Sequence, residues 1–388
     1  MRKNYTPQLS ARMRVGFLSY DYGVRRIGIS QTARDDLHCP NYFWLFCDRL
    51  VAIDHKKKRL IYMGVGDMVK SAREKSRQVE EKIARSKIIV HHKIHDIGPV
   101  KTGLFRSALT PKQYRAKIQK IKNHLRAGET YQVNFAQRFT STLNGDPWAI
   151  YKAVSRRNPS PFQAYFETED WAIISNSPEE LVRGRMDENG VCHLSTRPIK
   201  GTVPRGKTAA KDNENIKQLL QSEKDTAELT MIVDLERNDF GRICIPGSVK
   251  VKRHRAIEKY SHVIHTVSEI NGILQEDRRF EDVIKALFPG GSITGCPKRR
   301  TVEIINTLEK YKRGVYCGSA GYVSLDGNFD FNIMIRTLFA KKSPIVGKKY
   351  TLYLYSGGGI VMDSNPSREY EETMHKARAF FDVVSGIY

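Results

Sequence analysis

Apolar residues recur at helical spacing in several parts of the chain. The clearest predicted helix begins at Thr110 and Pro111, a capping residue followed by a first-turn proline, and ends at Gly128. Its apolar positions are Tyr114, Ile118, Ile121 and Leu125. Similar signals predict four more helices. One starts at Asp146 and Pro147, and the others span 222–238, 298–308 and 367–384. The segment 68–87 is polar on most sides and predicts a solvent-facing helix that separates an N-terminal group of strands from the remainder.

Strand-like runs rich in aromatic and β-branched residues lie between these helices. They span 15–20, 43–46, 131–135, 171–174, 321–325 and 350–355. Strands and helices do not alternate strictly along the chain, and no short-period repeat or low-complexity linker divides it. The pattern therefore favours an α+β fold over a doubly wound α/β fold.

Composition narrows the class of protein. The 388 residues include 65 Lys and Arg against 42 Asp and Glu, a formal charge of +23. No helix-turn-helix, zinc-finger or RNP pattern accompanies this charge, so we expect no nucleic-acid partner but a solvated surface or an anionic substrate. The six cysteines form no Cys-x-x-Cys pair, and the chain begins without a signal-peptide pattern. With no apolar run long enough to span a bilayer, we expect no membrane partner and a cytoplasmic location.

Two acidic pairs lie on predicted helices. Asp225 and Glu228 are three residues apart and share a helical face, as do Glu369 and Glu372, with Lys376 four residues further on. A few carboxylates with positions left for water and substrate would suit Mg²⁺. Acidic pairs are also common on solvated helix faces, so the pattern alone leaves both interpretations open.

Two glycine-rich stretches, 289–297 and 357–359, border predicted elements. Glycines at such places let backbone N–H groups approach an anion, and a helix N-terminus adds a favourable dipole. Tight turns are the alternative interpretation. Neither stretch has the Gly-Lys-Ser/Thr ending of a P-loop.

Four segments, 225–239, 289–298, 330–338 and 357–364, resemble the chorismate-binding enzyme family. The resemblance runs in one order from about Arg14 to Phe381. It implies an α/β sandwich of two antiparallel sheets with outer helices. It also implies a shortened, strand-rich N-terminal region over 1–100 and a catalytic domain over 101–388.

The resemblance assigns roles to individual residues. Mg²⁺ would be bound by Glu228 and Glu372, with Asp225 and Glu369 nearby. Lys200 would be the nucleophile and Glu179 the general acid, and His265 would lie beside the ring of chorismate or form a structural hydrogen bond. Substrate would be bound by Tyr322, Arg336, Lys376, Thr294, Gly295, Gly357, Gly358 and Gly359.

Within the family, the motif Arg197-Pro-Ile-Lys-Gly-Thr202 is the discriminating one. Aminodeoxychorismate synthases usually carry Lys at position 200, where anthranilate synthases carry Ala, and 131–139 also resembles the first subgroup. The expected activity is conversion of chorismate and ammonia to 4-amino-4-deoxychorismate, a precursor of para-aminobenzoate and folate. The ammonia would come from a separate glutamine amidotransferase subunit.

Three departures keep alternatives open. Ser177-Pro-Glu-Glu-Leu181 replaces the more usual Ser-Pro-Glu-Arg-Phe, and Leu229-Thr230 is closer to many anthranilate synthases. The family's tryptophan-binding motif lies before the first strand seen here, so we expect no inhibition by tryptophan. Anthranilate synthase component I is the alternative within the family, and a non-catalytic basic binding protein derived from it is the alternative of another class.

Overall fold

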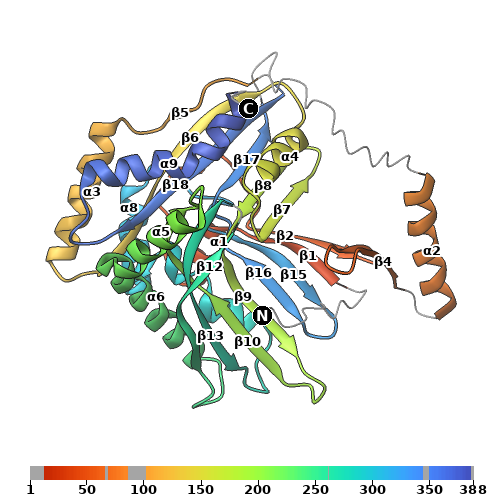
Figure 1. Cartoon of the computed structure of the whole chain (residues 1–388). Coiled ribbons are helices and arrows are strands. Elements are labelled where there is room, and N and C mark those ends of the chain that lie inside the picture. The colour runs from red at the N-terminus through yellow and green to blue at the C-terminus, as the bar shows by residue number, and fades with distance from the viewer. Residues whose placement is uncertain (1–12, 66–68, 86–101, 261, 344–348, 386–388) are drawn as a thin grey trace.

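The structure is a computed structural model that describes the chain except residues 1–12, 66–68, 86–101, 261, 344–348 and 386–388. Two large antiparallel sheets face each other, and helices cover their outer sides (Figure 1). The predicted α+β class and the sandwich of two antiparallel sheets are confirmed.

The first sheet has nine strands among the described residues, all joined by antiparallel pairs. In spatial order they are β11 (Ile199–Pro204), β13 (Val263–Ile273), β10 (Cys192–Arg197), β9 (Glu180–Met186), β16 (Phe329–Asn332), β15 (Ser319–Ser324), β1 (Met13–Leu18) and β2 (Tyr42–Cys47), with β12 (Lys250–Lys259) beside β13. Strands from both ends of the sequence therefore meet in one sheet.

The second sheet has seven strands in the same described part of the chain. They are β14 (Gly295–Cys296), β6 (Gln132–Leu143), β18 (Tyr350–Ile360), β17 (Thr337–Lys342), β8 (Trp171–Ser177) and β7 (Phe162–Glu167), with β5 (Arg106–Ser107) beside β6. Phe17 of the first sheet packs edge-on against Phe166 and Trp171 of the second, with ring centroids 6.0 and 5.8 Å apart. The main core is thus the layer between the sheets.

Helices pack on the outer sides of both sheets. The second sheet is covered by α3 (Pro111–Arg126), α4 (Pro147–Arg157), α8 (Lys298–Leu308) and α9 (Pro366–Val384), and the first by α5 (Ala209–Gln221) and α6 (Glu223–Gly241). The remaining elements are α1 (Tyr20–Arg26), α7 (Phe280–Leu287), the 3₁₀ turn η1 (Gly291–Ile293), the hairpin β3–β4 (Arg49–Asp54 and Arg59–Gly64) and α2 (Val69–Arg85). Within the described ranges, no helix is both long and apolar enough to cross a membrane.

The capping signals predicted most helix starts correctly. Thr110 and Gln113 form a capping box at α3, Asp146 caps α4, and Ser222 caps α6. The strand predicted over 15–20 is partly wrong, because Ser19 accepts a hydrogen bond from the N–H of Tyr22 and thereby starts α1. The placement of 357–359 after a strand is also wrong, since these glycines lie within β18.

The N-terminal segment is divided between two arrangements. Strands β1 and β2 belong to the large first sheet, whereas β3, β4 and α2 pack mainly on one another and extend away from the body of the protein (Figure 1). The predicted helix over 68–87 is described as α2, and residues 68, 86 and 87 lie outside the described residues. The division near residue 100 also falls outside them and stays a prediction.

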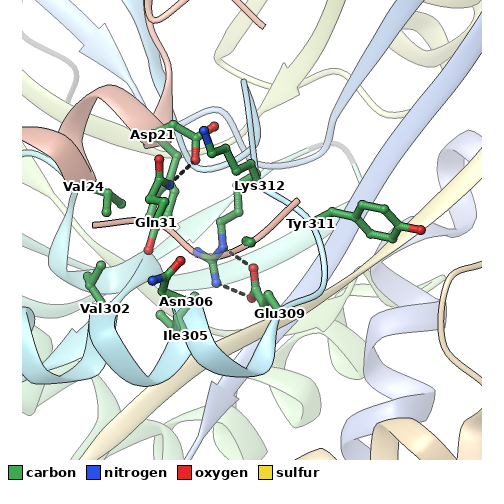
Figure 2. Close-up of a pocket in the computed structure, with 12 residues that line it drawn as sticks. Asp21, Val24, Gln31, Val302, Ile305, Asn306, Glu309, Tyr311 and Lys312 are labelled. Atoms are coloured by element: carbon green, nitrogen blue, oxygen red, sulfur yellow. Dashed lines mark hydrogen bonds and ion pairs between the residues drawn. The ribbon is translucent and has the colours of Figure 1, made fainter. Parts of the chain in front are cut away.

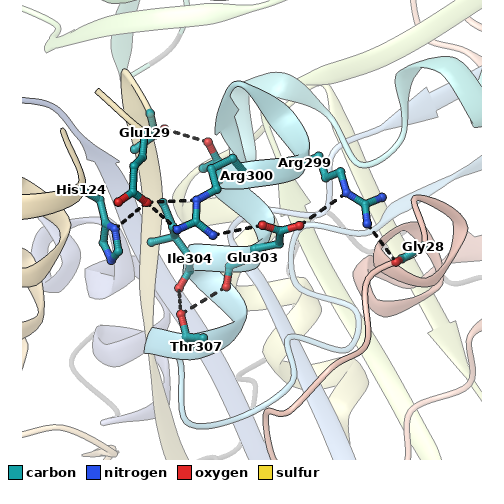
Figure 3. A network of polar contacts seen from close by, with 10 residues as sticks. Gly28, His124, Glu129, Arg299, Arg300, Glu303, Ile304 and Thr307 are labelled. Atoms are coloured by element: carbon teal, nitrogen blue, oxygen red, sulfur yellow. Dashed lines mark hydrogen bonds and ion pairs between the residues drawn. The ribbon is translucent and has the colours of Figure 1, made fainter. Parts of the chain in front are cut away.

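A buried ion pair joins several of these elements. The guanidinium of Arg313 donates two hydrogen bonds to the carboxylate of Glu309, at 2.9 and 2.7 Å, and the Arg313 residue is only 1% exposed. Figure 2 shows the surroundings of Glu309 with α1 residue Asp21 nearby. The arrangement contrasts with the exposed network of Glu129, Arg300 and Glu303 in Figure 3.

The two networks predict different losses in the free energy of unfolding when their arginine is replaced. Arg313→Met should lower the free energy of unfolding by about 3–5 kcal/mol, because it leaves the carboxylate of Glu309 buried and unpaired. Arg300→Met, the control, should cost less than about 1 kcal/mol, because its partners stay in water. Chemical denaturation of the two variants and the parent measures both values. Equal losses would contradict the assignment of the buried pair.

Candidate active site

A cavity of about 480 Å³ opens between the strands and helices that carry most of the predicted site residues. Those that line it are Glu179, Lys200, Asp225, Glu228, His265, Arg336, Gly357, Gly359, Glu372 and Lys376. They come from β11, β13, α6, β18, α9 and the turns beside β9 and β17, which are far apart in the sequence. The fold therefore gathers most of the predicted set around one space.

Lys200 owes its direction to an irregularity in β11. Lys200 pairs with Thr266 of β13 and Thr202 pairs with the adjacent His265, so the intervening Gly201 is an extra residue in the ladder. Gly201 has φ +74°, a conformation that suits glycine. The bulge brings Lys200, Gly201 and Thr202 all to the cavity wall. The Lys200 ammonium lies 3.2 Å from the carboxylate of Glu228.

Glu179 and Glu180 are adjacent, yet they have different surroundings. Glu179 lines the cavity and is 5% exposed. Burial raises its pKa above the usual value, and the nearby hydroxyl of Ser292 and the positive charge of Lys200 offset only part of this effect. Glu180 pairs instead with Arg183, and burial raises its pKa to about 8. A protonated Glu179 is thus the form that the cavity favours.

His265 is fixed from its Nδ1 side. That nitrogen lies 2.8 Å from the hydroxyl of Thr202, on the neighbouring strand. Burial and the adjacent charge of Arg336 lower the pKa of His265 to about 4, so the ring is neutral at physiological pH. A neutral ring can orient a polar ligand without adding to the positive charge of the cavity.

Arg336 is a cation without a paired anion among the described residues. Burial lowers its pKa, and Glu179 is the nearby acid that acts in the opposite direction. The residue has φ +49°, an uncommon backbone conformation that directs the chain from β16 to β17. A guanidinium held this way is suited to bidentate binding of a carboxylate from a ligand.

Lysines surround the acidic residues of α6 and α9. Lys224 lies 3.8 Å from Glu228 and 3.6 Å from Glu369, so it bridges the two helices. Lys376 lies 2.6 Å from Glu372 and donates a second hydrogen bond to the carbonyl of Gly357. Burial would raise the pKa of Glu372, but Lys376 lowers it below the usual value. Each of these carboxylates already has a cationic partner in the protein.

The glycine-rich strand differs from the predicted loop. Gly357, Gly358 and Gly359 pair with β6 along their whole length. A Cβ at Gly358 would lie 3.4 Å from Glu369 and 3.6 Å from both Glu372 and Lys376. Gly358 thus faces the charged groups of α9, while Gly357 and Gly359 line the cavity. The absence of side chains here lets α9 approach the sheet closely.

Four predicted substrate contacts do not line the cavity: Gly358, which faces α9, and Thr294, Gly295 and Tyr322. Thr294 is fully buried and donates to the carbonyl of Gly290, and Gly295 pairs with Val133 of β6. Tyr322 lies on β15 opposite Asp330, near Arg183 and Arg185. Glu369 is likewise absent from the lining, since its carboxylate accepts a hydrogen bond from Ser364. The role of Tyr322 in substrate binding stays a prediction, and Tyr322 is not among the residues that line this cavity.

Other residues line the cavity that the sequence did not indicate. They include Tyr316, Lys224, His375, Asn134 and Ser292. Tyr316 stacks on Tyr355 at an interplanar angle of 12° and takes the position expected for Tyr322. Asn134 lies on the polar face of the strand that begins near residue 131, and that alternation was the available signal for it.

Comparison with known proteins identifies the class to which this site belongs. The family model described as chorismate binding enzyme matches residues 1–382. The chain belongs to this family and is a chorismate-utilising enzyme.

Individual relatives carry more than one name. The chain is 40% identical to aminodeoxychorismate synthase component 1 of Bacillus subtilis, over 94% of this chain and 75% of that protein. It is 34% identical to anthranilate synthase component 1 of Synechocystis, over 90% and 71%. The crystal structure of anthranilate synthase component I from Streptococcus pneumoniae superposes with a TM-score of 0.84 at 29% identity, covering 98% of this chain and 83% of that one.

The two tyrosines provide a test of the cavity. Tyr316→Phe should lower kcat/KM for chorismate about tenfold to a hundredfold, as expected when a hydrogen bond to a charged ligand is lost. Tyr322→Phe, the matched control, should change kcat/KM less than about threefold, because Tyr322 lies outside the cavity. Steady-state kinetics with varied chorismate decides between them. A larger loss in Tyr322→Phe would mean that the ligand binds elsewhere.

Proposed function

We propose that this protein is aminodeoxychorismate synthase component I, which converts chorismate and ammonia to 4-amino-4-deoxychorismate. The observation that carries the proposal is the presence of Lys200 and the buried acid Glu179 on the wall of one cavity. A side-chain amine there gives the enzyme a nucleophile of its own, and an alanine at the same position would not. The product would serve para-aminobenzoate and folate synthesis.

Anthranilate synthase component I is the second candidate. Relatives named for that activity, such as the Synechocystis protein, match the chain almost as well as those named for the first. Lys200 favours the first candidate, because formation of anthranilate requires no lysine at this place. Leu229 and Thr230 favour the second only by resemblance.

The proposed reaction has two substitution steps. In the first, the amine of Lys200 attacks C2 of chorismate, both ring double bonds shift, and the C4–O bond breaks. Glu179 gives its proton to the departing oxygen, which leaves as water. In the second, ammonia attacks C4, both double bonds shift back, and the bond between C2 and Lys200 breaks. The proton released from the new ammonium group goes to Glu179, which restores both residues.

The charge of the cavity is suited to a dicarboxylate. Arg336 has no carboxylate partner among the described side chains and would bind one carboxylate of chorismate. Lys376 and the cavity-facing backbone of Gly357 and Gly359 would bind on the other side. The neutral ring of His265 would lie against the substrate ring.

The acidic residues of α6 and α9 fit a magnesium ion in chemistry. Glu228, Glu372, Asp225 and Glu369 are hard oxygen donors from two helices, the type that Mg²⁺ prefers. In the described part of the chain no three such groups converge on one point beforehand. When bound, Mg²⁺ would neutralise and orient a carboxylate of chorismate. Lysines now pair with Glu228, Glu369 and Glu372, so binding of the ion would require exchange of partners.

Product analysis with chorismate, magnesium chloride and ammonium salts tests the proposed function. We expect an amino-chorismate from the parent protein and its loss in Lys200→Ala. Without ammonia, the parent should retain a covalent adduct that maps to Lys200 by mass spectrometry. With glutamine in place of ammonium, turnover should require an added amidotransferase partner, because none of the cavity residues described is placed to hydrolyse glutamine.

Each other outcome has a definite meaning. Fluorescent anthranilate as the product would support the second candidate. Full activity in Lys200→Ala, or an adduct on another residue, would remove Lys200 from the mechanism. No turnover of chorismate at all would favour the alternative of a binding protein without catalysis.

Lys224 provides a test of the metal assignment. Lys224→Met should raise the affinity for Mg²⁺ about fivefold, because the ion no longer displaces an ammonium group that contacts Glu228 and Glu369. The variant should melt at a lower temperature than the parent in EDTA and at the same temperature in saturating Mg²⁺. Isothermal titration and thermal melting measure these effects.

Lys211 is the matched control for this test. Its side chain is 52% exposed, as is that of Lys224, but it pairs with Glu214 on α5. Lys211→Met should leave Mg²⁺ affinity unchanged. Unchanged affinity in Lys224→Met as well would show that the ion binds away from Glu228 and Glu369.

A further inference from the structure

Three buried oxygen atoms on the cavity wall lack a hydrogen bond of ordinary length to any described residue, although the Ser292 hydroxyl lies close enough to Glu179 to lower its pKa. They are Oδ1 of Asn134, Oγ of Ser292 and Oε1 of Glu179. The three residues are 8%, 5% and 5% exposed, and all three line the cavity. Buried polar atoms in folded proteins nearly always have partners, so this group indicates a ligand that donates hydrogen bonds.

The orientation of Asn134 is fixed by its other groups. Its backbone N–H donates to the carbonyl of Thr294 at 2.7 Å, and its own carbonyl accepts from the guanidinium of Arg313 at 2.6 Å. Its side-chain NH₂ donates to the carbonyl of Ser292 at 3.4 Å. Oδ1 has no partner of this kind, and it is an acceptor. The same contact holds the Ser292 backbone beside Asn134.

Oδ1 of Asn134 only accepts, so it does not fit a carboxylate. Ser292 Oγ can also accept, and Glu179 accepts at Oε1 once it has given its proton to the departing hydroxyl. Chorismate offers two carboxylates, which also accept, and a single hydroxyl as a donor. Ammonia is small, neutral and carries three N–H donors, one for each of the three oxygens. Its lone pair then remains free for attack.

We propose that Asn134, Ser292 and Glu179 form the subsite that binds ammonia for the amination step. The inference rests on the proposed function, because that reaction adds ammonia at C4 of chorismate. It gives Glu179 a position next to both reactants. Glu179 protonates the departing C4 hydroxyl, and the resulting carboxylate accepts a hydrogen bond from the incoming ammonia. After ammonia has formed its bond to C4, the extra proton passes to the same carboxylate.

Kinetics with two varied substrates test the subsite. Ser292→Ala and Asn134→Leu should each raise the KM for ammonium about fivefold to tenfold at alkaline pH, as expected when one hydrogen bond is lost. The KM for chorismate should change less than about twofold. The amount of Lys200 adduct formed with chorismate alone should stay that of the parent, since this step precedes ammonia.

Ser356→Ala is the matched control. Ser356 is also 5% exposed and lines the same cavity, but its hydroxyl already donates to the carbonyl of Thr373 at 2.8 Å. The KM for ammonium should therefore be that of the parent. Ser292→Ala removes one oxygen only, so it keeps the test valid if Asn134→Leu fails to fold.

The outcomes separate the subsite from the function. A parent protein that aminates chorismate, with an unchanged ammonium KM in both variants, would overturn the subsite and leave the proposed function standing. A rise in the chorismate KM equal to the rise for ammonium would also overturn it, because the oxygens would then bind chorismate. A parent that forms no amino product with ammonium would overturn both proposals.

Discussion

The buried guanidinium of Arg313 holds together the segments that form one wall of the cavity. It pairs with Glu309, and it also donates to the carbonyls of Asn134 on β6 and Ile293 in η1. The carboxylate of Glu309 accepts in turn from the N–H of Ala136. One ion pair thereby satisfies backbone groups of β6 and η1 beside the point where Gly295 pairs with Val133. Because the pair lies out of water, its hydrogen bonds act at low dielectric and fix these segments in one arrangement.

The charged side chains that line the cavity are arranged differently from this buried pair. One cation among them, Arg336, has no paired anion among the described residues. Lys224, Lys200 and Lys376 each contact a carboxylate, while Arg336 contacts none among the described residues. The side chains of Lys224 and Lys376 are 52% and 39% exposed, and ion pairs of such side chains are weak and exchange readily. A dicarboxylate substrate brings negative charge that such a site can accept by changing partners. The buried pair of Arg313 and Glu309 behind the cavity wall is thus rigid, whereas the charged side chains that line the cavity can change partners.

The sequence predicted elements better than it predicted which side chains face the cavity. Capping residues such as Thr110, Asp146 and Ser222 bond to backbone groups only two or three residues away. The helix starts could therefore be predicted from the local sequence. Tyr316 and Tyr322 lie six residues apart, and only the placement of β15 in the sheet decides which one faces the cavity. The resemblance pointed to Tyr322, whereas Tyr316 lines the cavity. The sequence predicted a strand over 350–355. Only the pairing with β6 shows that β18 continues through Gly357, Gly358 and Gly359.

Glu228 illustrates why the chemistry could not be read from motifs alone. The resemblance assigned Glu228 to a metal ion and Lys200 to attack on the substrate, as if the two were independent. In the structure they contact each other at 3.2 Å, and Lys224 approaches the same carboxylate. Lys200 can attack only after Glu228 has taken another partner, since an amine engaged with a carboxylate is not aimed at a ring carbon. Occupation of the acidic residues and availability of the nucleophile are therefore coupled through a single side chain. The bulge at Gly201 makes this coupling possible, because it brings Lys200 to the same wall as the acidic face of α6.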